Sequence, residues 1–232
     1  MRDKGLSRFH RSFAAIGLSF IGCILMVCLI PSCVISDYSH LSQTGHKTLT
    51  KGTLPKVFLA EFSSAVYDAS IDAYGNHFSG LLVIKRMKGE TFRTVLTTKF
   101  GSNLFDFSFP EGSDSLVVHQ CREELNRPRF ISLYKRDINL LLMRDILPAQ
   151  AKVLQSKSGK GPVYRIKKPE GRHFYYLNEN EKQLRKIEQA GFMKGKRVMI
   201  SLKSANSMQP SRIVINHQGV DLEVELALIK SN

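Results

Sequence analysis

The sequence predicts a mainly β protein of the α+β class, in which an antiparallel sheet meanders along the chain and one amphipathic helix is inserted. Two observations carry this prediction. Short segments of alternating polar and apolar residues are separated by Gly, Pro, Asn and Asp, and one longer segment has helical periodicity between two prolines. The composition of 43% hydrophobic and 23% charged residues in a chain of 232 is that of a globular protein, which excludes a disordered or collagen-like chain.

The first half of the sheet is predicted from four alternating segments that follow one another through short turns. These segments are Phe78–Met87, Thr91–Phe100, Asn103–Phe109 and Ser115–Gln120. In the third, Phe105, Phe107 and Phe109 fall on one side, as they would in a strand with one buried face. Turns of a few residues favour sequential antiparallel pairing. The preceding segment, Ser63–Tyr74, has weaker alternation and is interpreted as a strand in preference to a helix.

The second half of the sheet is predicted in the same way. The segments are His173–Leu177, Leu184–Ile187, Lys196–Lys203, Ser211–His217 and Val220–Ile229. The last alternates most regularly, with Leu222, Val224 and Leu226 on one face and acidic residues between them. Glu179–Ala190 as a whole suits either a strand or a helix, and Ser156–Gly161 is interpreted as a solvated hairpin tip because it lacks the Walker spacing.

The inserted helix is predicted over Arg129–Leu147, which Pro128 and Pro148 frame. Its apolar residues recur at helical spacing while basic residues occupy the other face. The apolar residues are Phe130, Leu133, Tyr134, Ile138, Leu141 and Leu142. Two roles are open for such a helix, namely completing the core over an open sheet face, or covering an apolar cavity.

The N-terminus has the layout of a bacterial export signal. Four basic residues precede the uncharged, largely apolar segment Ser12–Ile30, and Ile30-Pro-Ser-Cys33 is similar to the bacterial lipoprotein signal, in which the Cys is acylated. Cys23 and Cys28 are weaker candidates, and an uncleaved anchor helix is the alternative because the segment can span a bilayer. We therefore expect a signal peptide over 1–32, lipidation at Cys33, a tether over 33–55 and one domain over 56–232.

No pattern of catalytic or metal-binding residues is found, and we expect neither an enzyme, nor a cofactor, nor a metal site. The seven His lack ligand spacing, and no nucleophile motif has supporting context. Only Cys121 remains as a thiol after the signal, so no disulfide is expected within the domain. Removing residues 1–32 takes four basic residues and one Asp from a net charge of +14, which leaves +11. In an exported protein this charge favours an anionic membrane surface over nucleic acid.

Three segments resemble the LolA/LolB-like lipoprotein-carrier superfamily, in particular its outer-membrane receptor branch. These are Phe78-Ser-Gly-Leu-Leu-Val-Ile-Lys85, Gly101-Ser-Asn-Leu-Phe-Asp-Phe107, and Gln209-Pro-Ser-Arg-Ile-Val-Ile215 followed by Val220–Ile229. The resemblance covers about residues 60–230. It implies an unclosed barrel whose concave face, capped by helix, holds acyl chains of lipids or lipoproteins. It also implies a monomer held by a lipid anchor in the bacterial envelope, at the outer membrane facing the periplasm, which agrees with Val34 in place of an Asp after Cys33.

Under this resemblance, the apolar residues of the inner sheet face and the helix are candidates for lining a lipid cavity. The candidates are Phe92, Leu96, Phe105, Phe107, Ile138, Leu141, Leu142, Val198, Ile200, Leu202 and Val224. The alternative is that they pack together as a filled core, in which case the protein is a structural or protein-interaction lipoprotein. The family's receptor carries an apolar residue on an exposed loop that inserts cargo into the membrane. The loop matched to it here, Ser108–Asp114, offers Phe109 and Pro110.

Overall fold

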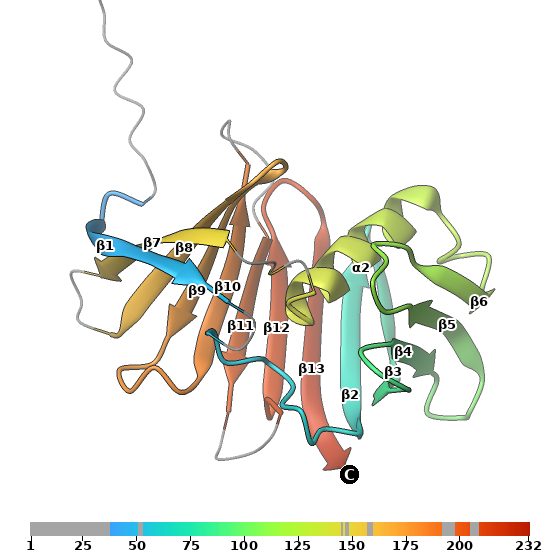
Figure 1. Ribbon diagram of the computed structural model, residues 1–232. Helices are drawn as coiled ribbons and strands as arrows, with labels where there is room; N and C mark the ends of the chain where they lie inside the picture. Colours follow the sequence, from blue (N-terminus) through green and yellow to red (C-terminus); the bar gives the residue numbers. More distant parts are fainter. Residues whose placement is uncertain are drawn as a thin grey trace, which may run out of the picture. The chain divides into compact units, whose positions relative to one another are not determined.

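A computed structural model describes residues 38–50, 53–144, 146, 149–156, 160–191, 198–204 and 209–232. The predicted signal peptide, the lipidation site Cys33 and the centre of the hairpin tip after Ser156 lie outside the described residues. Within them, the fold is mainly β. One antiparallel sheet of 13 strands curls around one helix, α2, and its two edge strands do not pair with each other (Figure 1). The predicted fold class is confirmed to this extent.

The strands follow one another along the chain with few exceptions to sequential pairing. They are β1 (Leu41–Leu49), β2 (Ser64–Ala73), β3 (Asn76–Arg86), β4 (Phe92–Thr97), β5 (Asn103–Phe109), β6 (Val117–Cys121), β7 (Ala149–Ser156), β8 (Pro162–Lys168), β9 (Gly171–Leu177), β10 (Leu184–Ala190), β11 (Val198–Lys203), β12 (Arg212–His217) and β13 (Leu222–Ser231). The order in the sheet is β1-β7-β8-β9-β10-β11-β12-β13-β2-β3-β4-β5-β6. Only the β1–β7 and β13–β2 neighbours are not consecutive in sequence.

The sheet begins earlier than the sequence predicts. Strand β1 lies inside the range 33–55, which was expected to be a tether, and it pairs with β7 from Leu41 opposite Ser156 to Leu49 opposite Ala149. Of its nine residues only Leu49 is fully buried. An edge strand with most side chains in solvent needs no apolar alternation, so its sequence resembles that of a linker.

The ambiguous segments resolve as strands, and the helix is shorter than expected. Strand β2 confirms the interpretation of Ser63–Tyr74, and β10 shows that the second half of Glu179–Ala190 is extended. Helix α2 spans Pro128–Leu141 instead of continuing to Leu147. It stops because Met143 has φ +53°, the left-handed conformation that ends an α-helix.

An aromatic contact joins β5 to α2 within the core. Tyr134 of the helix lies with its ring centroid 4.8 Å from Phe105 and 5.4 Å from Phe107. The two phenylalanine rings are themselves stacked at 4.6 Å. Alternation in β5 places these rings on the helix side, so α2 completes the core over this part of the sheet.

Strands β8 and β9 bury apolar residues on both faces. Tyr164, Ile166 and Tyr175 belong to the core that α2 covers. Alternation places Val163 and Tyr176, which pair directly, on the opposite face, where both are buried as well. We call this second side, defined by Val163, Tyr176 and the residues in register with them, the outer face of β7–β10.

Candidate functional site

A cavity of about 920 Å³ lies beside the C-terminal half of α2. The helix contributes one wall, the segment after β1 and the β3–β4 and β5–β6 turns a second, and the β8–β9 turn with the start of β9 a third. The lining residues are Thr50, Leu54, Lys56, Glu90, Glu111, Gly112, Ser113, Asp114, Ser132, Lys135, Arg136, Asn139, Leu140, Met143, Arg144, Ile146, Lys168, Pro169, Glu170, His173 and Gln189. The size is near the upper end of the range for small-molecule sites.

The cavity lining combines apolar side chains with charged side chains that form ion pairs. Leu54, Leu140 and Met143 supply buried apolar surface. The charged groups form ion pairs across the cavity wall, since Lys56 lies 3.3 Å from Glu90 and Lys135 lies 3.0 Å from Asp114. Such a lining accommodates an amphiphile, because an apolar chain and a polar head each find a compatible surface.

Three residues form the polar end of the cavity, where His173 is opposite Gln189 in the β9–β10 register. The His173 side chain is buried, and its Nε2 lies 3.1 Å from Glu170 Oε1. Burial lowers the pKa of His173, an effect that the Glu170 carboxylate partly opposes. The imidazole is therefore neutral at neutral pH and lines the cavity without adding charge.

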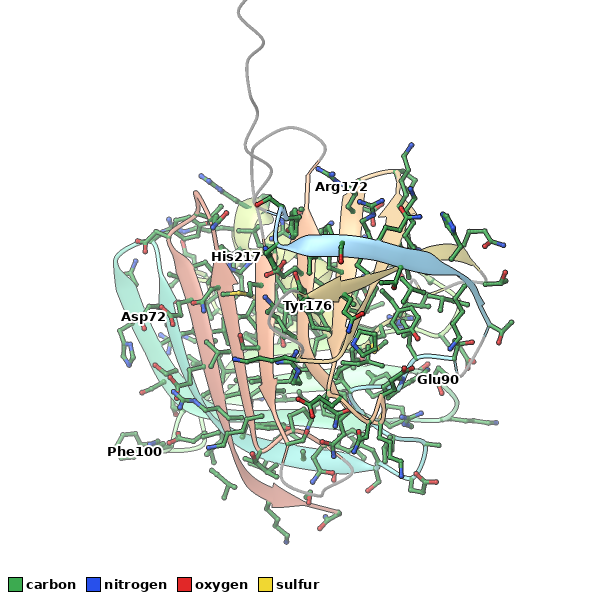
Figure 2. All side chains as sticks on the ribbon, turned by 90° about the vertical axis from the view of Figure 1, so that its left-hand side faces the viewer. Asp72, Glu90, Phe100, Arg172, Tyr176 and His217 are labelled. Atoms are coloured by element: carbon green, nitrogen blue, oxygen red, sulfur yellow. The ribbon has the colours of Figure 1, made fainter. Side chains whose placement is uncertain are left out.

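A buried ion pair fixes α2 to the sheet next to the cavity. Asp137 Oδ2 lies 2.9 Å from His217 Nε2, and the side chains are 4% and 1% exposed. His217 Nδ1 is 2.8 Å from the carbonyl oxygen of Leu222, which can only accept, so this nitrogen carries a proton. Arg136, which lines the cavity, also contacts Asp137 at 3.2 Å. Figure 2 labels His217 near the end of its strand.

Sequence reasoning missed this pair. Asp137 lies in the predicted helix and His217 ends a predicted strand, and neither has a spacing that points to the other. The helix periodicity holds one available signal, because Asp137 lies three residues after Tyr134 and four before Leu141, a spacing that places it on the same face as these apolar residues.

The predicted lining residues lie together in the core. All eleven belong to the apolar cluster or pack against it, and only Leu202 and Val224 are partly exposed. None of them lines the 920 Å³ cavity, and Leu202 lines a smaller one of about 130 Å³. Their role in lipid binding stays a prediction, and the residues beside the cavity come instead from turns and from the polar side of α2.

The loop candidates for membrane contact occupy different positions from those expected. Phe109 is 0% exposed and faces Tyr134, since it continues the alternation of Phe105 and Phe107, so it is not available to a membrane. Pro110 uses its carbonyl oxygen to accept a hydrogen bond from Arg144.

An exposed aromatic residue is present at another turn instead. Phe100, the last residue of the predicted strand Thr91–Phe100, is 98% exposed at the β4–β5 turn (Figure 2). Strand β4 ends at Thr97, and Thr98 closes a turn with Ser102 through a backbone hydrogen bond of 2.8 Å. The turn removes Phe100 from the alternation and directs it into solvent.

Among the described residues, no group of His, Cys, Asp and Glu could hold a metal ion. The same part of the chain contains no helix with the length and apolar character needed to cross a membrane.

Comparison with known proteins gives a likeness to solved structures only. No family model and no curated protein matches the chain. A DUF1329 family protein from Desulfovibrio piger is similar with a TM-score of 0.39 at 8% identity, covering 75% of this chain and 86% of that one. A LolA superfamily protein from Nitrosomonas europaea has a TM-score of 0.39 at 8% identity and covers 76% of this chain and 88% of its own. At this identity the likeness concerns the fold.

Proposed function

We propose that this protein is a bacterial envelope lipoprotein, anchored through Cys33, that binds acyl chains of lipids or lipidated proteins in the cavity beside α2. It would act without catalysis in the localisation of lipoproteins to the outer membrane. The observation that carries the proposal is the cavity of about 920 Å³, in which apolar side chains and charged groups lie side by side. The resemblance of the sequence to the lipoprotein-carrier superfamily supports the same class of ligand.

The physics of acyl binding suits such a cavity. Each methylene group transferred from water to an apolar surface contributes about 0.8 kcal/mol, so a chain can be held without polar recognition. Leu54, Leu140 and Met143 offer that surface. The ion-paired residues around them keep their charges compensated, and this lets a lipid headgroup or a lipidated peptide lie at the cavity mouth without an unpaired buried charge.

Phe100 supports a membrane-proximal role. A fully exposed phenylalanine at a tight turn has no structural function, because it contributes nothing to the core. Exposed aromatic side chains partition favourably into the membrane interface. We therefore transfer the proposed membrane contact from Phe109 and Pro110 to Phe100.

Native mass spectrometry of the full chain, released from detergent, tests the cavity. We expect co-purified lipid on the wild type and its loss in Ser132→Phe, which fills the cavity without burying a charge. Ile229→Phe is the matched control, since Ile229 is 58% exposed and lies in β13, a strand that contributes no residue to the cavity lining. Lipid retained by Ser132→Phe, or a wild type that is always free of lipid, contradicts the proposal. Mass analysis of the N-terminal peptide, with Cys33→Ala as comparison, tests the anchor.

A second candidate has its own supporting observation. The eleven apolar residues expected to line a cavity are packed against α2 and one another, as in a filled core. This favours a non-catalytic structural or protein-interaction lipoprotein of the envelope. A protein partner recovered equally by wild type and Ser132→Phe, with no lipid on either, distinguishes this candidate from the first.

A further inference from the structure

Strand β6 (Val117–Cys121) is one of the two edges of the sheet, because it pairs with β5 on one side and with no described strand on the other (Figure 1). Backbone N–H and C=O groups therefore face solvent along its free side. The register identifies one residue that presents such groups. Arg122 N donates to the carbonyl oxygen of Leu104 at 2.9 Å, so the alternation of an antiparallel strand directs the N–H and C=O of Cys121 to the free side.

The free side of β6 is open to solvent. Val117 is 41% exposed and Val118 is 43% exposed. The polar side chains of the strand lie over the neighbouring strand instead of over the edge. His119, the extra residue of a bulge in the β5–β6 pairing, has its Nε2 2.7 Å from Ser108 Oγ, and the Gln120 amide oxygen accepts from a β5 side chain at 3.2 Å. The bulge therefore does not place a side chain across the edge.

Strand β6 lacks the residues that usually protect a sheet edge from pairing. Natural edge strands carry charged side chains, above all Lys, or Pro. The other edge of this sheet, β1, holds Lys47. The sequence of β6 contains neither a charged residue nor a Pro, and two β-branched valines are adjacent in it. A neutral, exposed edge of this composition is suited to receive another strand.

The segments on both sides of β6 are acidic, although the chain has a net charge of +14. Residues 110–124 include four acidic residues and one basic residue. Two of the acidic residues have basic partners within the chain. Glu111 before the strand and Glu123 after it are exposed and form no ion pair with another described residue. An uncompensated negative charge therefore remains beyond each end of the free edge.

We infer that β6 binds an extended segment of a partner polypeptide with basic residues at both ends, which pairs with the free edge as an additional strand. Backbone hydrogen bonds give the attraction, the valines contact alternate side chains, and the flanking carboxylates pair with the basic ends. A second copy of this chain fits less well, because antiparallel pairing of two β6 strands brings the acidic segment before one strand against the acidic segment after the other. The inference concerns the sheet edge and does not depend on ligand binding in the cavity.

Synthetic peptides added to the full chain in detergent test both parts of the inference. We expect the peptide KKTVTVTVKK to bind and to slow backbone hydrogen–deuterium exchange at residues 117–121. The peptides EETVTVTVEE and KKTVPVTVKK should bind on the order of tenfold more weakly, because the first lacks the matching charge and the second lacks a backbone donor in the paired segment. Equal protection of β6 by either of these two peptides would overturn the inference, as would the absence of protection by KKTVTVTVKK.

A pair of variants separates the edge from net charge. Val118→Lys places a charge on the free edge and should weaken binding of KKTVTVTVKK on the order of tenfold. Ile229→Lys is the matched control, since it adds the same charge at a position that is 58% exposed in β13, a strand with a neighbour on each side. Both variants should keep the circular dichroism spectrum of the wild type. An equal loss of binding in the control would overturn the inference, and so would a dimer that protects residues 117–121 without peptide.

Discussion

Two parts of the same sheet use their helix-facing surface differently. Where β5 meets α2, Phe105, Phe107 and Phe109 have no exposed surface, and they pack against Tyr134, which is 8% exposed. Across β8–β10 the corresponding surface carries His173 and Gln189 and opens onto the cavity. The difference shows that one helix performs two tasks. Its aromatic side chains close a core, and its C-terminal half, together with Met143 just after its end, borders a cavity.

Truncation of Phe107 is expected to have the largest effect. Phe107→Ala removes a ring that is 0% exposed and stacked on Phe105, so we expect a loss of about 4 kcal/mol in the free energy of unfolding. Chemical denaturation of the full chain measures it. Phe100→Ala is the matched control, because a side chain that is 98% exposed contributes little to stability. Similar losses for both would contradict the description of the β5–α2 contact as the closed region.

The link between the two regions is the buried pair of Asp137 and His217. Asp137→Asn leaves a histidine that is 1% exposed without its counter-charge, and we expect a loss of about 3 kcal/mol. Thermal or chemical unfolding measures it, with Glu225→Gln as control. Glu225 pairs with Arg212 at the surface, where an ion pair contributes only about 0–1 kcal/mol. Equal effects would mean that the buried pair does not hold the helix in place.

Met143 allows the cavity to be compared with the closed core by mutation. It is as buried as many core residues, yet it borders open space, so Met143→Ala should cost only about 1 kcal/mol. Leu141→Ala, at a position with 0% exposure in the closed core, should cost about 3 kcal/mol. The pair of unfolding free energies is the measurement. Equal losses for Met143→Ala and Leu141→Ala would mean that Met143 packs in a filled core and does not border a cavity.

The smallest effect concerns pH. Because the folded-state pKa of His173 lies below its ordinary value, the unfolded chain binds a proton more readily, and His173 reduces stability as the pH falls through about 6.5. His173→Gln should therefore flatten the loss of stability between about pH 7 and pH 5. Unfolding curves across this range measure it. His40→Gln, at an exposed position, should leave the profile of the wild type intact.

Much of the fold could be predicted from sequence for strands that bury one face and expose the other to solvent. Strand β5 has the predicted bounds, and β13 shows the expected burial of Leu222 and Leu226. Strand β1 could not be predicted, since an edge strand in solvent carries no apolar pattern. The exposure of Phe100 was missed as well, because β4 ends at Thr97, three residues before the end of the predicted strand, and alternation no longer applies at Phe100.

The cavity was less accessible to sequence reasoning than the fold. Apolar residues marked the core correctly, but the core and the cavity are different places in this sheet. Lys56, Lys135 and His173 line the cavity although they are far apart in sequence. The antiparallel register and the position of α2 bring these residues together, and no local sequence pattern indicates that they are close in space.

Strand β13 has a consequence for how the chain folds. It lies between β12 and β2, pairing Leu222 with Ala73 and continuing to Ser231 opposite Ala65. Strand β13 therefore pairs on one side with β12, its neighbour in sequence, and on the other with β2, which lies far earlier in the chain. Long-range pairing of this kind makes folding slow, so we expect the contact between β13 and β2 to form in a late step of folding.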